Sequence, residues 1–515
     1  MTSDRPDAPS RSDPMARLAG LSPRRRLVLA GLGGAVAALG QAPLNAWPLT
    51  ILGIALIHAC ALCDPGPRRS ALTWWIGGTG YFAVALSWIV EPFLVDIARH
   101  GWMAPFALVF MATGMALFWG LAGFAARLAA PDGRRLGLAT VLALTLAGAL
   151  RGVIFTGFPW ALPGHALIAS PALHLAQFGG AIVLSLIVLG LAVSLPAVLA
   201  RPLPRAGHWA LALAIPVALG SWMQAPETAT EGRPVVRLVQ PNVPQDEKWD
   251  REKAQDHFTN ILDLTSADGT PDVVVWPETA MPAWLEDVPH LMPVISSAAG
   301  AKPVIFGVNR GEDLRVYNSL VLLEGEGEIT EVYDKHHLVP FGEYVPFGDL
   351  LGRIGISGLA ARQGYGFSSG PGPRLIDVPG LGRALPLICY EGVFPRDLRT
   401  EDRPEFLLLI TNDAWFGTVS GPYQHLAQAR LRAVEQGLPM IRVANTGISA
   451  MIDPGGRLHG EMALGTGGFR DVALPAPRPA TPYAIGGDLP LVSLLILVLA
   501  ALGVANSGKM RINKR

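Results

Sequence analysis

The sequence predicts a polytopic α-helical membrane region joined to an α/β domain. Of the 515 residues, 50% are hydrophobic and only 16% are charged, and the mean hydropathy is +0.35. These values are too apolar for a soluble enzyme of this length and are typical of a chain that lies partly in lipid. Long hydrophobic runs follow one another before about residue 223. From about residue 232 the pattern changes to short apolar runs, turns and charged stretches, until one last hydrophobic run near the C-terminus.

We expect about eight transmembrane helices, because a bilayer core of roughly 30 Å requires about 20 helical residues. The candidate ranges are 27–44, 48–63, 71–90, 104–126, 136–157, 174–199, 207–223 and 488–506. The first two are short and are separated only by a turn over residues 43–48. A tight helical hairpin, or a pair that only partly crosses the bilayer, is therefore an alternative for this pair.

The positions of arginine and lysine predict the orientation, because basic loops stay in the cytoplasm. Basic residues occupy every second loop, and the alternate loops hold almost none, with Arg99 as the exception. The basic residues are Arg24, Arg25, Arg26, Arg68, Arg69, Arg127, Arg134, Arg135, Arg201, Arg205, Lys509, Arg511, Lys514 and Arg515. Both ends of the chain are therefore expected in the cytoplasm, with the α/β domain on the opposite side of the membrane.

This organisation predicts five parts. They are a cytoplasmic tail over 1–26, a bundle of about seven helices over 27–223, the α/β domain over 232–475, a last transmembrane helix over 488–506 and a basic cytoplasmic tail over 507–515. Residues 1–22 are rich in Ser, Asp, Pro and Arg and are expected to be disordered. A secretion signal cleaved near Ala42 is an alternative for the N-terminus. The lack of a clean cleavage site favours an uncleaved first helix.

The 232–475 segment is predicted to contain two layers of sheet covered by helices. The candidate strands are 235–240, 273–276, 304–308, 319–323, 385–389, 406–410 and 440–443. Several of them are continuous apolar runs, which indicates that both faces of the sheet are covered. Helical stretches at about 251–265 and 423–436 would provide the cover.

Cysteine is scarce, with three residues in the chain, and Cys389 is the one outside the apolar N-terminal half. It follows an apolar run over 384–388 and is expected at the end of a buried strand, where α/β folds place their chemistry. Cys60 and Cys63 form a C-x-x-C pair, a pattern found in redox sites. Their apolar helical surroundings favour a role as small buried side chains. Cys389 is therefore expected to be a free thiol.

Two other segments supply the groups that a thiol nucleophile needs. A thiol with an ordinary pKa near 8.5 requires a base or a nearby cation to react at neutral pH. Glu278, after the strand at 273–276, can take the thiol proton and later return it. Lys335 can hold the thiolate and the oxyanion of a tetrahedral intermediate, with help from the main-chain N–H of Tyr390. A structural ion pair between Glu278 and Lys335 is the alternative, which the strand-end Cys389 disfavours.

In their order along the chain and their strand-end positions, these residues resemble the Glu-Lys-Cys triad of the nitrilase or carbon-nitrogen hydrolase superfamily, which implies an αββα sandwich. Seven spans before such a domain and one after it are similar to a single branch, the apolipoprotein N-acyltransferase family. Further matching segments are 240–249, 337–346 and 411–417. The resemblance covers nearly the whole chain from about residue 27.

The resemblance implies a two-step acyl exchange at the bacterial inner membrane, with the α/β domain in the periplasm. Cys389 would take an acyl chain from the sn-1 position of a phospholipid, phosphatidylethanolamine, as a thioester. The α-amino group of the S-diacylglyceryl cysteine at the N-terminus of an apolipoprotein would then attack the thioester. No cofactor, metal or nucleic acid is expected as a partner, and the sequence contains neither a metal-ligand cluster nor a phosphate loop.

The resemblance also implies supporting residues. Glu343 would support Lys335 or the proton transfers, and Glu391 would order the nucleophile turn. Trp249 would form a wall of the substrate site, although local packing is an alternative for an exposed tryptophan. Asn412 and Asp413 end a strand beside the site and are expected to be structural.

The long segment 343–373 is rich in glycine and apolar residues and lacks a regular pattern. Loops of this length in a compact domain are usually functional lids or disordered segments. The apolar residues Leu350, Leu351, Ile354, Ile356 and Leu359 favour a lid that dips into the membrane surface, and a mobile surface loop is the alternative.

Two other classes of function remain open. A membrane-anchored amidase of the nitrilase type would use the same triad but pass the acyl group to water. A non-catalytic lipid-binding protein would keep the fold but lose the triad, and the presence of all three residues counts against it.

Overall fold

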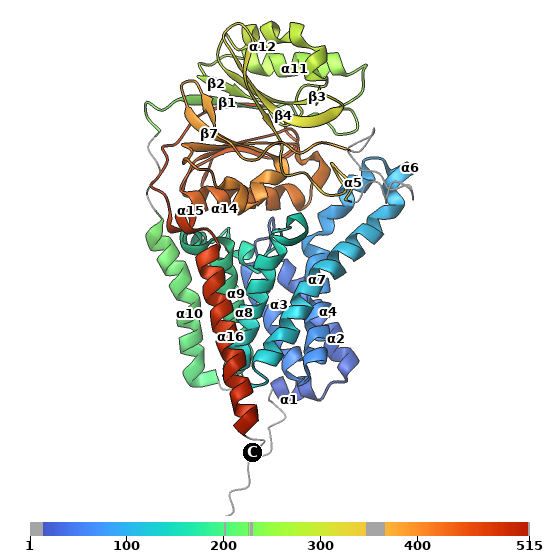
Figure 1. Ribbon diagram of the computed structural model, residues 1–515, viewed down its shortest axis with the longest axis vertical. Coiled ribbons are helices and arrows are strands. Elements are labelled where there is room, and N and C mark those ends of the chain that lie inside the picture. The colour runs from blue at the N-terminus through green and yellow to red at the C-terminus, as the bar shows by residue number, and fades with distance from the viewer. Residues whose placement is uncertain (1–13, 200–201, 225, 227–229, 347–365, 513–515) are drawn as a thin grey trace, which may run out of the picture. The chain divides into compact units, whose positions relative to one another are not determined.

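The computed structural model describes residues 14–199, 202–224, 226, 230–346 and 366–512 (Figure 1). The chain separates into two compact units. The first comprises Met1–Ser87, Pro105–Gln224 and Gly486–Arg515, and the second comprises Trp88–Ala104 and Ala225–Ile485. Most of the predicted lid lies outside the described residues, which leave out 347–365.

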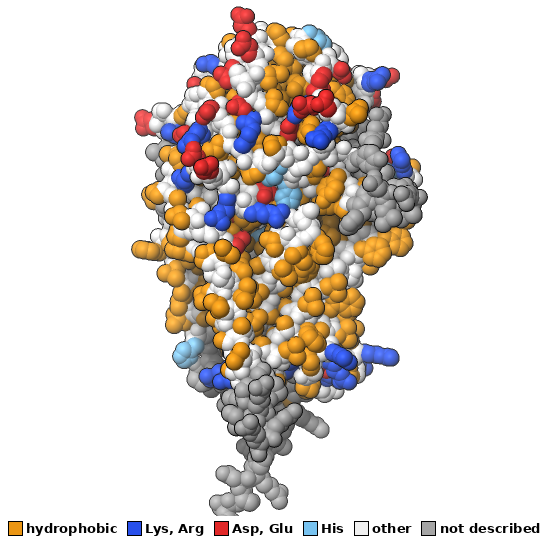
Figure 2. Space-filling view, in the orientation of Figure 1, with side chains coloured by type: hydrophobic (Ala, Val, Ile, Leu, Met, Phe, Trp, Pro, Cys, Tyr) orange, Lys and Arg blue, Asp and Glu red, His pale blue; other side chains and the backbone are white. Residues whose placement is uncertain are grey.

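The first unit is helical, and each of the eight predicted spans coincides with a helix. These helices are α2 (Pro23–Ala38), α3 (Trp47–Leu62), α4 (Pro67–Ala85), α7 (Ala104–Ala129), α8 (Gly133–Arg151), α9 (Ala176–Leu199), α10 (Pro202–Met223) and α16 (Leu489–Ile512). Within the described ranges, five helical stretches are long and apolar enough to cross a membrane: Ile97–Ala129, Gly133–Arg151, Pro171–Leu199, Ala206–Met223 and Leu489–Asn506. Hydrophobic side chains predominate on the visible surface of these helices (Figure 2).

The three remaining predicted spans correspond to α2, α3 and α4, and α2 and α3 have only 16 residues each. The three N-terminal helices pack closely through glycine. A Cβ atom at Gly34 of α2 would lie 1.8 Å from the carbonyl oxygen of Gly77 in α4, so glycine is required for this approach. A buried ion pair between Arg26 and Asp64, at 2.9 Å, joins the start of α2 to the chain just after α3. Helices α2 and α3 pack against each other, which agrees with the hairpin considered as an alternative, and their crossing of the bilayer stays a prediction.

Three details of the helical region differ from the expectations, in which the ends of each span were uncertain by several residues. Residues Pro14–Ala19 form a short helix, α1, inside the tail that was expected to be disordered. Helix α8 ends at Arg151 rather than near residue 157, because residues Ile154–Thr156 form a separate 3-10 turn, η3. Helix α4 ends at Ala85, and the chain then continues into η1 (Ser87–Val90), α5 (Glu91–Leu94), α6 (Ile97–His100) and η2 (Gly101–Met103).

The second unit contains two six-stranded sheets, in the orders β12-β1-β2-β3-β4-β5 and β11-β10-β9-β8-β7-β6. The strands of the first sheet are β1 (Val235–Gln240), β2 (Val273–Val275), β3 (Val304–Glu312), β4 (Arg315–Glu324), β5 (Glu328–Asp334) and β12 (Gly468–Ala473). Those of the second are β6 (Ile376–Val378), β7 (Gly382–Ile388), β8 (Phe406–Thr411), β9 (Met440–Ala444), β10 (Ser449–Ile452) and β11 (Leu458–Met462). Three neighbouring strands in each sheet are parallel: β1, β2 and β3, and β7, β8 and β9.

The two sheets face each other across one hydrophobic core, which includes Leu238, Val275 and Leu320 of the first sheet and Ile388 and Ile410 of the second. Helices α11 (Ala254–Ser266) and α12 (Met292–Ala298) cover the outer face of the first sheet, and α14 (Gly421–Gln436) covers that of the second (Figure 1). The predicted αββα sandwich is therefore confirmed. The parallel strands are buried on both faces, which explains their continuous apolar runs.

Five strands were not predicted: β5, β6, β10, β11 and β12. Two of them are edge strands of the first sheet, and both carry exposed polar residues. Strand β5 reads Glu-Ile-Thr-Glu-Val-Tyr-Asp, and its four polar residues other than Tyr333 are exposed or half-buried. No residue of β12 is fully buried. Each of these strands pairs on one side only and is only partly buried, so it lacks the apolar run by which the inner strands are recognised.

Candidate active site

Cys389 lies directly after β7, as the first residue of the short 3-10 helix η8 (Cys389–Val393). Its φ angle is +51°, in the left-handed region that a non-glycine residue adopts at a cost of about 1–3 kcal/mol. The side chain is buried, and its thiol is free. His425 on α14 contacts the main-chain oxygen of Cys389 through Nε2, at 3.3 Å. The strained turn therefore presents a buried thiol at the end of a central strand, as the sequence predicted.

Glu278 lies three residues after the end of β2, and its carboxylate is held on both oxygens. Oε1 accepts a hydrogen bond from Asn318 Nδ2 at 2.7 Å, and Oε2 accepts one from the main-chain N–H of Asn412 at 2.8 Å. Gly307 on β3 lets the Glu278 turn lie across it, because a Cβ atom there would come within 2.6 Å of Glu278 Cα. Burial raises the pKa of Glu278, and the charge of Lys335 opposes this rise. A carboxylate with a raised pKa is suited to accept and return a proton.

Lys335 follows β5 directly and is almost completely buried. Its Nζ lies 2.8 Å from Glu343 Oε1 and 3.8 Å from Glu278 Oε1. Burial alone would lower the pKa of Lys335, but the charges of Glu343 and Glu278 outweigh it and hold the pKa above its ordinary value. Lys335 therefore remains a cation at any physiological pH.

The thiol of Cys389 shares this environment. Burial raises its pKa, the Glu278 carboxylate raises it further, and Lys335 partly opposes both effects. The resting thiol is therefore protonated at neutral pH, so reaction requires a base that takes its proton when the substrate is bound. The electrostatic coupling of Cys389 to Glu278 and Lys335 shows that the fold brings the three predicted catalytic residues together.

Glu343 and Glu391 each join two parts of the site. Glu343 binds Lys335 through Oε1, and its Oε2 accepts a hydrogen bond from the N–H of Val339 at 2.8 Å. Glu391 Oε2 accepts from the N–H of Ile388 at 2.7 Å, while its Oε1 accepts from the N–H of His336 at 2.7 Å. Glu391 thereby links the chain before Cys389 to the chain after Lys335. Its buried carboxylate is satisfied by these main-chain donors, by the hydroxyl group of Tyr333 at 3.2 Å and by the ring of His336, whose Nδ1 lies 2.6 Å from Oε1.

Comparison with known proteins adds to this geometry. The carbon-nitrogen hydrolase family model matches residues 235–474, and the model of the apolipoprotein N-acyltransferase N-terminal domain matches residues 33–194. The apolipoprotein N-acyltransferase of Rhodopseudomonas palustris is 39% identical over 510 residues, which cover 92% of this chain and 94% of that protein. That of Brucella melitensis is 38% identical over 529 residues, which cover 95% and 97% of the two chains.

The chain belongs to the apolipoprotein N-acyltransferase family. It is therefore a membrane protein and an acyltransferase of the carbon-nitrogen hydrolase superfamily, with bacterial relatives. A solved carbon-nitrogen hydrolase superfamily protein of Xanthomonas campestris also aligns with half of this chain and 96% of its own. That likeness is weak, at 18% identity and a TM-score of 0.36, and adds nothing to the family match.

The roles of two other predicted site residues, Tyr390 and Trp249, stay predictions in this acyltransferase. The ring of Tyr390 is buried and packs edge-on against Phe394, with 4.7 Å between the ring centroids. This packing concerns the ring, so the predicted role of the main-chain N–H of Tyr390 at the oxyanion stays a prediction. Trp249 lies in the turn region after β1 with 44% of its surface exposed, which agrees with either a substrate wall or a local surface position.

Three residues that contact Glu278 were not predicted as part of the site. Asn318 on β4 donates to its carboxylate, and Lys248 Nζ donates to its main-chain oxygen at 3.3 Å. Asn412 was expected to be structural, yet its N–H donates directly to the Glu278 carboxylate. Asp413 next to it forms a buried ion pair with Arg442 at 2.6 Å, as a structural residue would.

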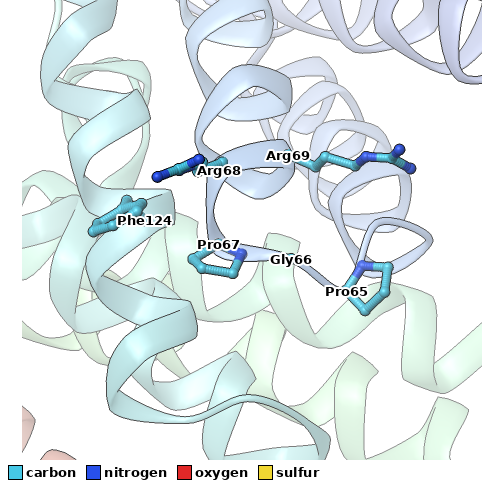
Figure 3. A pocket seen from close by; sticks show the side chains of 6 residues that line it. All are labelled: Pro65, Gly66, Pro67, Arg68, Arg69 and Phe124. Carbon is cyan, nitrogen blue, oxygen red and sulfur yellow. The ribbon is translucent and has the colours of Figure 1, made fainter.

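A cavity of about 570 Å³ lies in the first unit, at the start of α4 (Figure 3). It is lined by Pro65, Gly66, Pro67, Arg68, Arg69 and Phe124. Both arginine side chains are exposed, and none of the residues around Cys389 lines the cavity.

Proposed function

We propose that this chain transfers an acyl chain from a membrane phospholipid, through a thioester on Cys389, to an apolipoprotein. The acceptor is the α-amino group of the N-terminal S-diacylglyceryl cysteine, and the product is the mature triacylated lipoprotein. Family membership supports the overall reaction. The observation that carries the mechanism is the free, buried thiol of Cys389 at a strained turn, coupled to the carboxylate of Glu278 and the ammonium group of Lys335.

In the first half-reaction, Glu278 takes the proton of Cys389 as the sulfur attacks the acyl carbonyl carbon. Lys335 stabilises the oxyanion, together with the main-chain N–H of Tyr390. The ester C–O bond then breaks, and Glu278 passes its proton to the leaving oxygen of the lysophospholipid. We propose phosphatidylethanolamine as the donor, with its sn-1 chain transferred.

In the second half-reaction, the neutral α-amino group of the apolipoprotein attacks the thioester. Glu278 takes a proton from the attacking nitrogen, the C–S bond breaks, and the proton returns to the sulfur of Cys389. Glu343 holds Lys335 in place through both steps, and Glu391 keeps the turn of the nucleophile ordered. No step requires a metal or a cofactor, because one carboxylate carries the proton in both directions.

The acceptor decides between this function and a membrane-bound amidase. Wild-type protein incubated with phospholipid alone is expected to accumulate one acyl group on Cys389, because the sulfur is buried and little water reaches the thioester. Adding a diacylglyceryl-cysteine peptide should discharge it and yield acylated peptide. Intact-protein mass spectrometry measures the adduct, and an N-acetylated form of the same peptide is the matched control. Rapid loss of the adduct without peptide would favour the amidase.

We also propose that the second unit lies in the periplasm of a bacterial inner membrane and that both chain ends are cytoplasmic. Cysteine introduced at Glu326, in the exposed turn between β4 and β5, should react with an impermeant maleimide in intact spheroplasts. Cysteine at Asp132, in the exposed turn between α7 and α8, should react only after lysis. Both are made in a Cys60→Ala/Cys63→Ala/Cys389→Ala background, so that the introduced cysteine is the single thiol of the chain. The reverse pattern would overturn the orientation.

A further inference from the structure

A second buried lysine lies beside the catalytic carboxylate, and the mechanism above does not use it. Lys248 is only 5% exposed, and its Nζ donates a hydrogen bond to the main-chain oxygen of Glu278 at 3.3 Å. Lysine is almost never buried to this extent unless it is paired. Some interaction at this site must therefore offset the cost of burying the Lys248 ammonium group.

The chain that carries this lysine is fastened to the site by side-chain amides. Asn445 binds both main-chain groups of Val243, accepting from its N–H at 3.0 Å and donating to its oxygen at 2.8 Å. Asn412 Nδ2 donates to Gln245 Oε1 at 2.7 Å, and its N–H binds the carboxylate of Glu278. The same network therefore positions both the proposed base and the buried lysine.

The balance of charges at the site explains why a second cation is needed there. Two buried carboxylates, Glu278 and Glu343, face one cation, Lys335, which leaves one negative charge without a partner in this set. During the proposed reaction this negative charge moves from Glu278 to the sulfur and then to the oxyanion. Glu278 and Cys389 both interact electrostatically with Lys248, so a positive charge there stabilises the site before and after the proton transfer.

We propose that Lys248 is a positioning residue of the acyl transfer, which fixes the main chain of Glu278 and supplies the second positive charge of the buried site. The inference rests on the proposed function and adds to it a group outside the Glu-Lys-Cys triad. The ammonium group acts through Glu278 and Cys389 and needs no contact with the substrate.

Because Lys248 can lose its proton, the proposal predicts how the rate of acyl-enzyme formation depends on pH. Burial lowers the pKa of Lys248 to about 8, although Glu278 and Cys389 oppose the decrease. Lys248 is therefore positive below this pH and neutral above it, so the rate should fall as the pH rises through about 8. Cys389 and Lys335 have pKa values raised far from this range. The charged neighbour of Lys248 in the sequence, Glu247, forms an ion pair at the surface with Lys253, at 2.6 Å.

The experiment follows acyl-enzyme formation from phosphatidylethanolamine vesicles alone, because the apolipoprotein amine would itself titrate near this pH. Single-turnover rates from pH 6 to pH 10 are measured by mass spectrometry of Cys389 in wild-type protein and in Lys248→Met, Lys248→Arg and Lys253→Met. Lys248→Met should lower the rate about 10-fold to 100-fold, less than removal of a direct oxyanion donor, and lose the alkaline decrease. Lys248→Arg should restore most of the rate and move the decrease to higher pH, because arginine stays charged. Lys253→Met should behave as wild type.

The outcomes separate the two proposals. Absence of any adduct on wild-type Cys389 would refute the proposed function. A wild-type adduct, together with unchanged rate and pH profile in Lys248→Met, would refute the role of Lys248 alone. If Lys248→Met does not fold, as judged by its thermal transition, the arginine variant decides by itself. An alkaline decrease that stays near pH 8 in Lys248→Arg would overturn the proposal.

Discussion

Replacing Cys389 by alanine is expected to abolish acyl transfer and to remove the acyl adduct that wild-type protein forms with phospholipid. The methyl group of alanine cannot form a thioester, and within the described residues the thiol of Cys389 is the one coupled to both Glu278 and Lys335. Turnover should fall to background, and the mass of the variant should not change after incubation with phospholipid. Any activity that remained would have to use another nucleophile.

The matched control is the double variant Cys60→Ala/Cys63→Ala. Both cysteines are free, Cys60 is fully buried in α3, and Cys63 follows that helix with its Sγ 3.4 Å from the oxygen of Ala59. These positions require only a small apolar volume, so activity should stay within a few-fold of wild type, as for other conservative core changes. Loss of activity in the double variant at normal expression would revive the redox interpretation of the C-x-x-C pair.

Glu278→Gln and Lys335→Ala are expected to prevent formation of the thioester, rather than only its discharge. Glutamine cannot accept the thiol proton, and its amide group would turn one N–H donor toward Asn318 or Asn412, both of which already donate. Loss of a general base costs about 10²–10⁴ in rate, and loss of an oxyanion donor costs on the order of 10²–10³. Both variants should therefore show no adduct on Cys389 over the time in which wild type is fully acylated.

Exposed residues of the same type provide the controls for this pair. Glu286→Gln and Lys302→Ala change the same charges on the surface of the second unit and should leave the rate unchanged. The thermal transition of each variant shows whether it is folded. Because burial raises the pKa of Glu278, the wild-type rate should also fall as the pH decreases and this carboxylate becomes protonated. A normal acyl-enzyme in folded Glu278→Gln would remove Glu278 from the role of base.

Much of the second unit follows from local patterns. The central strands β2, β7 and β8 are continuous apolar runs because they are buried on both faces, and a reader of the sequence finds them directly. Glu278 and Cys389 come within a few residues of such runs, so their strand-end positions were predictable. Lys335 has no such local signal, because β5 before it is a polar edge strand with no apolar run of its own. It was selected as the cation that a thiol nucleophile needs and by its resemblance to a known triad.

The two-part organisation, the inner strands of the sandwich and the three residues proposed to carry the reaction could all be predicted from the sequence alone. Tertiary structure decided which polar groups surround the base. Lys248, Asn318 and Asn412 reach Glu278 from 30, 40 and 134 positions away in the chain. A buried polar side chain is recognised by its hydrogen-bond partner. When that partner is distant in the sequence, no local pattern reveals the pair. The surroundings that set the pKa of Glu278, and the buried charge of Lys248, therefore exist only in the folded protein.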